Sequence, residues 1–187
     1  MKKIFLLPII IICLLLTQLT SLSSEQTQKT EETLKFNNEI YYLKYSRTSP
    51  TATINEYTRK AETVYDWDKL LAVRHWNNVN IKLKKYIKES YDIVKDDYIP
   101  LSISCDDNIA YVCFLMLSND YLEYNCWKYI AKDKEILAIQ YAKKFKITKK
   151  TTIEKLMKQV QAHHSEIMPI MNSDLNIEVK FLDIGEE

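Results

Sequence analysis

Residues 101–145, LSISCDDNIAYVCFLMLSNDYLEYNCWKYIAKDKEILAIQYAKKF, decide the fold. The stretch contains four runs rich in Ile, Leu, Val and Tyr, at 101–105, 109–118, 121–130 and 135–145. Short groups of Asp, Asn and Lys separate these runs. Apolar runs of this length between turn residues are typical of β-strands joined by tight loops. The stretch therefore predicts an antiparallel meander of four strands.

The loop between the second and third runs sets a strand register. If Asn119-Asp120 is a two-residue hairpin loop, Ser118 pairs with Tyr121, and the same register places Cys113 opposite Cys126. Alternation from the turn makes the cysteines a non-hydrogen-bonded pair, with Cα atoms about 4.5 Å apart. A disulfide accepts that spacing. We predict Cys113 and Cys126 as the disulfide candidate, and two reduced thiols packed as apolar side chains are the alternative.

The segments before the meander predict a hairpin and two helices. Residues 39–45 and 52–57 are rich in Ile, Tyr and Thr and flank the turn signal 47–50, which is typical of a β-hairpin. Residues 62–76 place Val64, Trp67, Leu70 and Leu71 at helical spacing. Residues 81–94 are amphipathic. We expect a short helix in each of the last two segments.

The segments after the meander predict one more helix and a last strand. Thr151 and Glu154 have the spacing of a capping box, so a helix should begin at Thr151 or the next residue and end before Pro169. In this helix we expect His164 on the core side and His163 in solvent. Residues 176–184 alternate in polarity and predict an edge strand.

Together these elements describe one α+β domain over residues 36–187. In it, an antiparallel sheet, built from the hairpin and the meander, packs against about three helices, and an α/β/α sandwich is one arrangement that would fit. Residues 24–35 are polar and predict a flexible leader before the domain.

The element order, with residues 62–71 (ETVYDWDKLL) as a helix after the first hairpin, resembles the Mog1/PsbP-like proteins. The resemblance covers the layout of residues 36–168. It implies an α/β/α sandwich and a role as an accessory or binding protein rather than an enzyme. It implies no particular site residue.

The N-terminus has the pattern of an export signal. Lys2 and Lys3 precede an apolar run at 4–16, and Ser21 and Ser23 fit the small residues of a cleavage site. The apolar run is shorter than the about 20 residues that a transmembrane helix needs. We therefore expect residues 1–23 to be a signal peptide, and the mature protein to be periplasmic or secreted with no stable membrane anchor.

Removal of the signal peptide determines the charge and cysteine count of the mature chain. About 164 residues remain, with 24 basic and 25 acidic side chains, which gives no indication of nucleic-acid binding. The single glycine, Gly185, excludes the usual phosphate-binding loops, so we expect no cofactor. Three cysteines remain, so one internal bridge leaves one thiol, and Cys105 would compete for a partner if the hairpin loop differed by one residue.

Few residues offer catalytic chemistry. Cys105 with His75 or His163 would suit a thiol enzyme, and His163 with Glu166 would offer two metal ligands on one helix face. The chain has neither a thiol-enzyme signature nor the three or four ligands that a metal site needs. We therefore assign no catalytic, cofactor-binding or metal-binding residue.

The aromatic residues suggest a binding role. Trp67, Trp76 and Trp127 are candidate interface residues, since aromatics supply much of the energy at interfaces, although core packing is the alternative. We expect an exported, non-catalytic bacterial envelope protein that binds another protein, as an accessory or immunity-type factor. A small thiol- or metal-dependent hydrolase and a small-ligand carrier are the alternatives.

Overall fold

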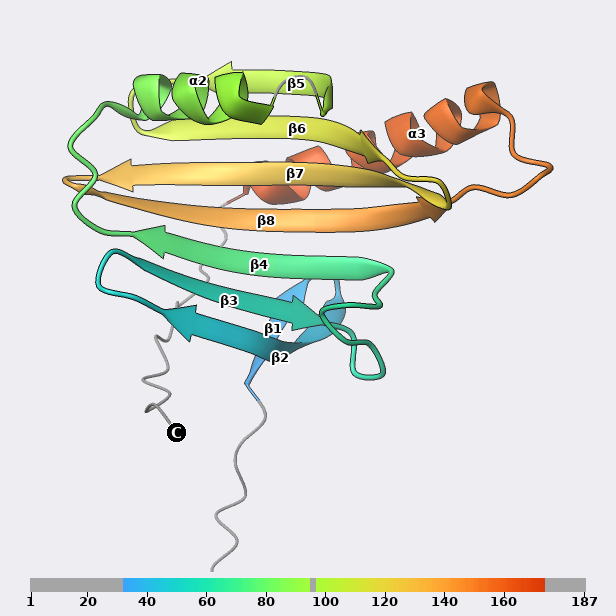
Figure 1. Ribbon diagram of the computed structural model, residues 1–187, viewed down its shortest axis with the longest axis horizontal. Coiled ribbons are helices and arrows are strands. Elements are labelled where there is room, and N and C mark those ends of the chain that lie inside the picture. The colour runs from blue at the N-terminus through green and yellow to red at the C-terminus, as the bar shows by residue number, and fades with distance from the viewer. Residues whose placement is uncertain (1–31, 95–96, 174–187) are drawn as a thin grey trace, which may run out of the picture. The chain divides into compact units, whose positions relative to one another are not determined.

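The computed structural model describes residues 32–94 and 97–173, and these form one antiparallel sheet of eight strands with two helices. Figure 1 shows the strand order β1-β2-β3-β4-β8-β7-β6-β5. The strands are β1 (Thr33–Phe36), β2 (Glu39–Thr48), β3 (Ala52–Thr58), β4 (Lys69–Trp76), β5 (Ile99–Cys105), β6 (Ile109–Leu117), β7 (Tyr121–Lys132) and β8 (Glu135–Lys146).

The sheet consists of two four-stranded meanders that join side by side. The first contains β1 to β4 and the second contains β5 to β8, and the seam between them is the pairing of β4 with β8. This seam brings Leu71 opposite Tyr141 and Val73 opposite Ile139. The two halves therefore share one hydrophobic core rather than forming separate domains.

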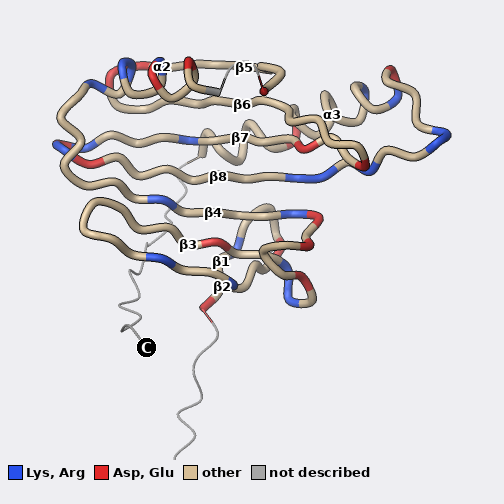
Figure 2. Tube along the Cα trace, viewed as in Figure 1, with Lys and Arg blue, Asp and Glu red and all other residues tan. Residues whose placement is uncertain are grey.

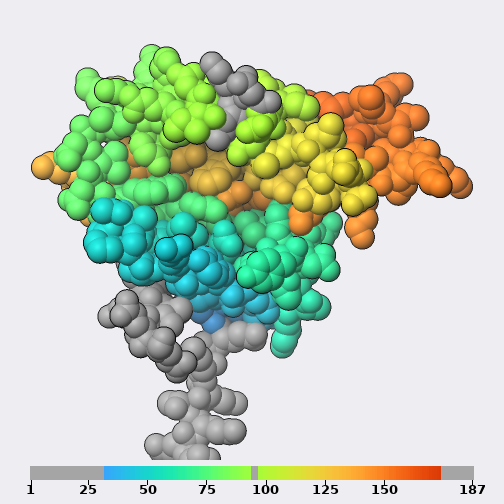
Figure 3. Space-filling model, in the orientation of Figure 1, coloured from blue at the N-terminus to red at the C-terminus, as the bar shows by residue number. Residues whose placement is uncertain are grey.

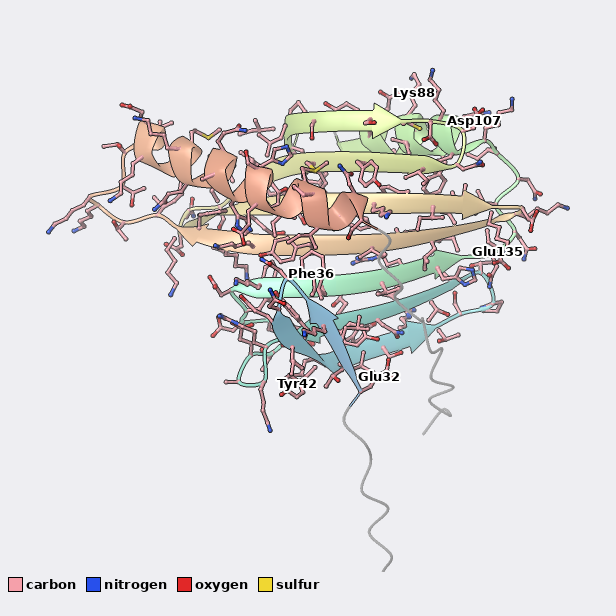
Figure 4. All side chains as sticks on the ribbon, turned by 180° about the vertical axis from the view of Figure 1, so that it is seen from behind. Glu32, Phe36, Tyr42, Lys88, Asp107 and Glu135 are labelled. Carbon is pink, nitrogen blue, oxygen red and sulfur yellow. The ribbon has the colours of Figure 1, made fainter. Side chains whose placement is uncertain are left out.

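The two helices pack on opposite faces of the sheet (Figures 1 and 4). Helix α3 (Ile153–Asn172) buries Leu156, Val160 and Ile167 against the face that carries Cys113, Cys126 and the buried tyrosines. Helix α2 (Leu83–Val94) buries Leu83 and Ile87 against Val112 and Phe114 of β6. Because side chains alternate along each strand, each helix covers a different set of residues in β6.

The predicted fold class, an α+β arrangement with about three helices, is wrong. The described residues form mainly an eight-stranded antiparallel sheet, and they contain two helices rather than three. The predicted hairpin is confirmed as β2 and β3, and the predicted meander is confirmed as β5 to β8. Residues 33–35, assigned to the flexible leader, instead form β1 together with Phe36 and pair with β2.

The helix predicted at residues 62–76 is wrong and accounts for much of this difference. Its second half is β4, in which Leu71 and Val73 point to the α3 side while Leu70 and Ala72 point to the other side. A strand that is buried on both faces has a nearly continuous apolar sequence, which local periodicity does not separate from a buried helix. The resemblance to Mog1/PsbP-like proteins used this segment as a helix, and that motif is instead a loop followed by a strand.

The third predicted helix exists but differs at both ends. Thr152, rather than Thr151, is the N-cap, and its hydroxyl accepts from the Lys155 backbone N–H. Pro169 lies inside α3, which continues to Asn172. The predicted signal peptide at 1–23 and the predicted strand at 176–184 lie outside the described residues. Neither helix within 32–94 and 97–173 is long and apolar enough to cross a membrane.

Candidate functional site

The three tryptophans predicted as interface residues share one side of the sheet. Trp76 lies three residues after Val73 in β4, so the two side chains point to opposite faces of the sheet, and Val73 faces α3. Trp127 of β7 follows Cys126, which also faces α3, and pairs with Gln140 of β8. The rings of Trp76 and Trp127 therefore both point away from α3. Trp67 packs against Leu70 and Ala72 on the same side. Helix α2 packs on this side near β6, while β3, β4, β8 and β7 are visible beside it in Figures 1 and 3.

We call this uncovered part of the sheet the open face. Charged residues gather toward the strand ends and on α2, as Figure 2 shows. The open face is defined by these residues of β2, β3, β4, β7 and β8: Tyr45, Ile54, Glu56, Arg74, Glu123, Asn125, Trp127 and Gln140. Trp76 and Tyr129 lie at its border, where both contact Tyr86 of α2.

A chain of hydrogen bonds crosses the open face. The Arg74 guanidinium donates to Glu56 on β3 at 3.1 Å and to the Gln140 carbonyl on β8. The Gln140 amide donates to Asn125 Oδ1 at 2.7 Å, and the Asn125 amide donates to Glu123 at 2.9 Å. Because each of these polar side chains is hydrogen-bonded to the next, their positions are fixed across the four strands β3, β4, β8 and β7.

Arg74 is the central charge of the open face. Burial lowers the pKa of its guanidinium, and the nearby Glu56 carboxylate opposes that shift. The guanidinium carbon lies 4.7 Å from the centre of the Trp127 ring, within the range of a cation–π contact. The indole N–H of Trp127 is buried and has no acceptor among the described residues. This Arg–Trp pair combines two residue types that dominate binding energy at protein interfaces.

The other two tryptophans are engaged in packing. Trp76 contacts Tyr86 of α2 with ring centres 5.9 Å apart, and Tyr86 in turn contacts Tyr129 at 6.4 Å. The Lys144 ammonium lies 4.0 Å from the Trp67 ring centre. Trp76 therefore helps fix α2 to the sheet, and Trp67 covers the end of the open face.

The residues considered for a thiol enzyme do not come together. Cys105 pairs with Ala110 and lies on the α2 side of the sheet. His75 pairs across the sheet with Leu137, on the α3 side, and His163 is part of α3. The sheet thus separates the thiol from both imidazoles. Burial and the Asp106 carboxylate raise the pKa of the Cys105 thiol, which disfavours the reactive thiolate.

His163, expected in solvent, is instead buried at 6% exposure, while His164 is only half-buried. The Nδ1 atom of His163 lies 3.3 Å from the Glu166 carboxylate, and its Nε2 atom lies 3.1 Å from the Tyr141 hydroxyl. Burial and the nearby Lys143 lower the pKa of His163 to about 4, so the ring is neutral at pH 7. It lines a shallow, open depression with Phe145 and Gln159. Both histidine nitrogens have protein partners, so the ring serves packing rather than metal binding.

The polar residues of the open face were not predicted from the sequence. Arg74, Gln140 and Asn125 each lie in the middle of an apolar strand, two residues from Trp76, from Ala142 or from Trp127. A polar residue two positions from an aromatic in a strand shares its face, and that spacing would have found Arg74 beside Trp76 and Asn125 beside Trp127. Gln140 has Ala138 and Ala142 at the same spacing, so the sequence offers no such signal for it. The error at β4 concealed Arg74, because a helix would have placed it elsewhere.

Among the described residues, no three or more His, Cys, Asp or Glu side chains form a group that would hold a metal ion.

Comparison with known proteins shows a family and no curated relative. A search of curated proteins finds no match. Residues 29–174 match the model of a protein family. This match covers more than half of the chain, from just before β1 to just after α3, and the chain therefore belongs to that family.

Proposed function

We propose that this is an exported, non-catalytic bacterial envelope protein that binds another protein through the open face. The proposal of export rests on the signal-peptide pattern at 1–23. The proposal of binding rests on one observation, the assembly of Arg74, Trp127 and the polar chain on a sheet face that no helix among the described residues covers.

Two properties of the open face favour a protein partner. Its polar groups are fixed by mutual hydrogen bonds, so little side-chain entropy is lost when a partner packs on them. Its aromatics and Arg74 are the residue types that supply large binding energies in a flat interface. A small ligand would instead need a concave, enclosed pocket.

Photo-crosslinking at two matched positions tests the proposal. Tyr45, on the open face, is 40% exposed, and Met157, on α3, is 39% exposed. Each position is replaced with a photoreactive phenylalanine analogue, and the full chain is produced and irradiated in its native envelope. We expect a discrete, stoichiometric adduct from position 45 and none from position 157.

A third variant ties the adduct to the open face. Trp127→Ala in the position-45 crosslinker should abolish the adduct while the circular dichroism spectrum stays that of the parent. Equal labelling at both positions, or no adduct at position 45, would contradict the proposal. Loss of function in Cys105→Ser or His163→Gln, with stability unchanged, would favour the enzyme alternative instead.

A further inference from the structure

Cys113 and Cys126 lie directly opposite each other in neighbouring strands. The pairing of β6 with β7 runs without a bulge from Leu117–Leu122 through Cys113–Cys126. At the turn, the Ser118 backbone N–H donates to the Tyr121 carbonyl at 2.9 Å. Alternation from that bond makes Cys113–Cys126 a non-hydrogen-bonded pair, the type that brings opposite side chains closest together. The register predicted from the sequence is confirmed.

The two sulfur atoms are closer than packing alone requires. Cys113 Sγ and Cys126 Sγ lie 2.8 Å apart, and Met168 Sδ of α3 lies 3.5 and 3.6 Å from them. Non-bonded heavy atoms of this kind pack at about 3.5–4.0 Å, whereas bonded disulfide sulfurs lie about 2.05 Å apart. The two sulfur atoms would therefore need to move less than about 1 Å toward each other to form a covalent bond.

No other cysteine in the described residues competes for this pairing. Cys105 lies opposite Ala110, on the α2 side of the sheet, whereas Cys113 and Cys126 belong to the core under α3. A bond from Cys105 to either of them would have to pass through the sheet. The geometry therefore leaves one pair and one separate thiol.

We propose that Cys113 and Cys126 form a disulfide in the mature protein and that Cys105 remains a free thiol. Each cysteine loses one proton and one electron, and a protein or small-molecule disulfide accepts both electrons and leaves as two thiols. Both side chains are 0% exposed, so this exchange takes place during folding, before α3 covers the strands. The inference rests on the proposed export, which would place the protein in an oxidising compartment where the bond persists.

A soft metal ion is the other partner for three neighbouring sulfurs. Two thiolates on one tetrahedral zinc, at about 2.3 Å from the metal, would lie about 3.8 Å apart. The observed separation of 2.8 Å is too short for two ligands of one ion. The distance favours the covalent bond, and metal content is measured in the test below.

The test counts thiols in the exported protein purified without any reductant. The protein is unfolded in guanidinium with a maleimide reagent and its intact mass is measured. We expect one adduct before reduction and three after reduction, with a tryptic peptide pair linked through Cys113 and Cys126. The same mass gives the N-terminal residue, so a chain that is not processed is distinguished from one that is processed but reduced.

Two variants and one elemental measurement complete the design. Cys105→Ser should give no adduct before reduction, and Cys126→Ser should give two. Three adducts in the unreduced wild type would overturn the proposal, and so would a linked peptide pair that includes Cys105. One equivalent of zinc or copper in the purified protein, measured by mass spectrometry of the elements, together with three free thiols, would assign the sulfurs to a metal.

Discussion

At the scale of the residue, His163 shows how burial determines the state of a side chain. Its ring lies between Tyr141, Phe145 and Tyr124, and Glu166 and Lys143 are the charged groups beside it. Burial, which removes water from the ring, and the nearby Lys143 ammonium both disfavour the protonated form of His163. The buried histidine is therefore a source of pH-dependent stability.

We predict that the protein loses stability as the pH falls from about 6.5 to about 4. The pKa of His163 is lowered from 6.5 to about 4, so in that range the unfolded chain binds a proton that the folded chain does not. The loss is about 2 kcal/mol after allowance for solvent near Glu166. Urea unfolding of wild type and His163→Gln at several pH values measures it. Because burial also lowers the pKa of His164, His164→Gln measures the separate contribution of that neighbouring ring. Equal pH profiles for His163→Gln and wild type would contradict the prediction.

Arg74 carries the second prediction at this scale. Arg74→Ala leaves the Glu56 carboxylate and the Gln140 carbonyl without their donor, and both partners are largely buried. We expect a loss of about 2 kcal/mol in unfolding free energy. Denaturant titration of Arg74→Ala, Glu56→Gln and the double variant measures the coupling. A strictly additive double variant would show that the ion pair contributes nothing.

At the scale of the element, the sequence predicted strands better than it predicted helices. The turn residues around 106–108, 119–120 and 131–134 marked the meander, because Asp and Asn stop a strand by their own backbone preferences. The register of Cys113 followed from the loop length alone. By contrast, β4 was not predicted as a strand. Its long-range pairing with β3 and β8 places it inside the sheet with both faces buried, so its sequence lacks the polar–apolar alternation that indicates a strand.

The candidate site was predictable to a lesser degree. The three tryptophans could be selected by residue type, but their common side depends on β4 being a strand. The links among Arg74, Gln140 and Asn125 join segments up to 66 residues apart in the chain. Such contacts follow from the order of strands in the sheet, which no local pattern specifies.

The N-cap of α3 provides a prediction for an element. The Thr152 hydroxyl accepts from the Lys155 backbone N–H, and Thr152→Ala removes this acceptor. We expect a loss of about 1 kcal/mol, while Thr152→Ser retains the hydroxyl and costs a few tenths. Thermal unfolding of the two variants compares them directly. An alanine variant as stable as the serine variant would show that water replaces the cap.

At the scale of the whole molecule, the sulfur pair and the helix α3 stabilise the same region. Met168 of α3 contacts both Cys113 and Cys126. The hydroxyl of Tyr124, in β7, lies 3.0 Å from Nδ1 of His164 in α3. The core under α3 contains residues from both meanders, including Leu71 of β4. A bond between the two cysteines would therefore restrain the second meander where the helix docks.

We therefore predict that reduction of this bond destabilises the whole molecule. The cysteines are 13 residues apart, and closing a loop of about that length in the unfolded chain is worth about 3 kcal/mol. Adding a thiol reductant should lower the unfolding free energy of wild type and of Cys105→Ser by this amount, measured by guanidinium titration. The Cys113→Ala/Cys126→Ala variant should not respond to reductant. A response in that double variant would show that the reductant acts elsewhere, and equal stability of wild type with and without reductant would contradict the prediction.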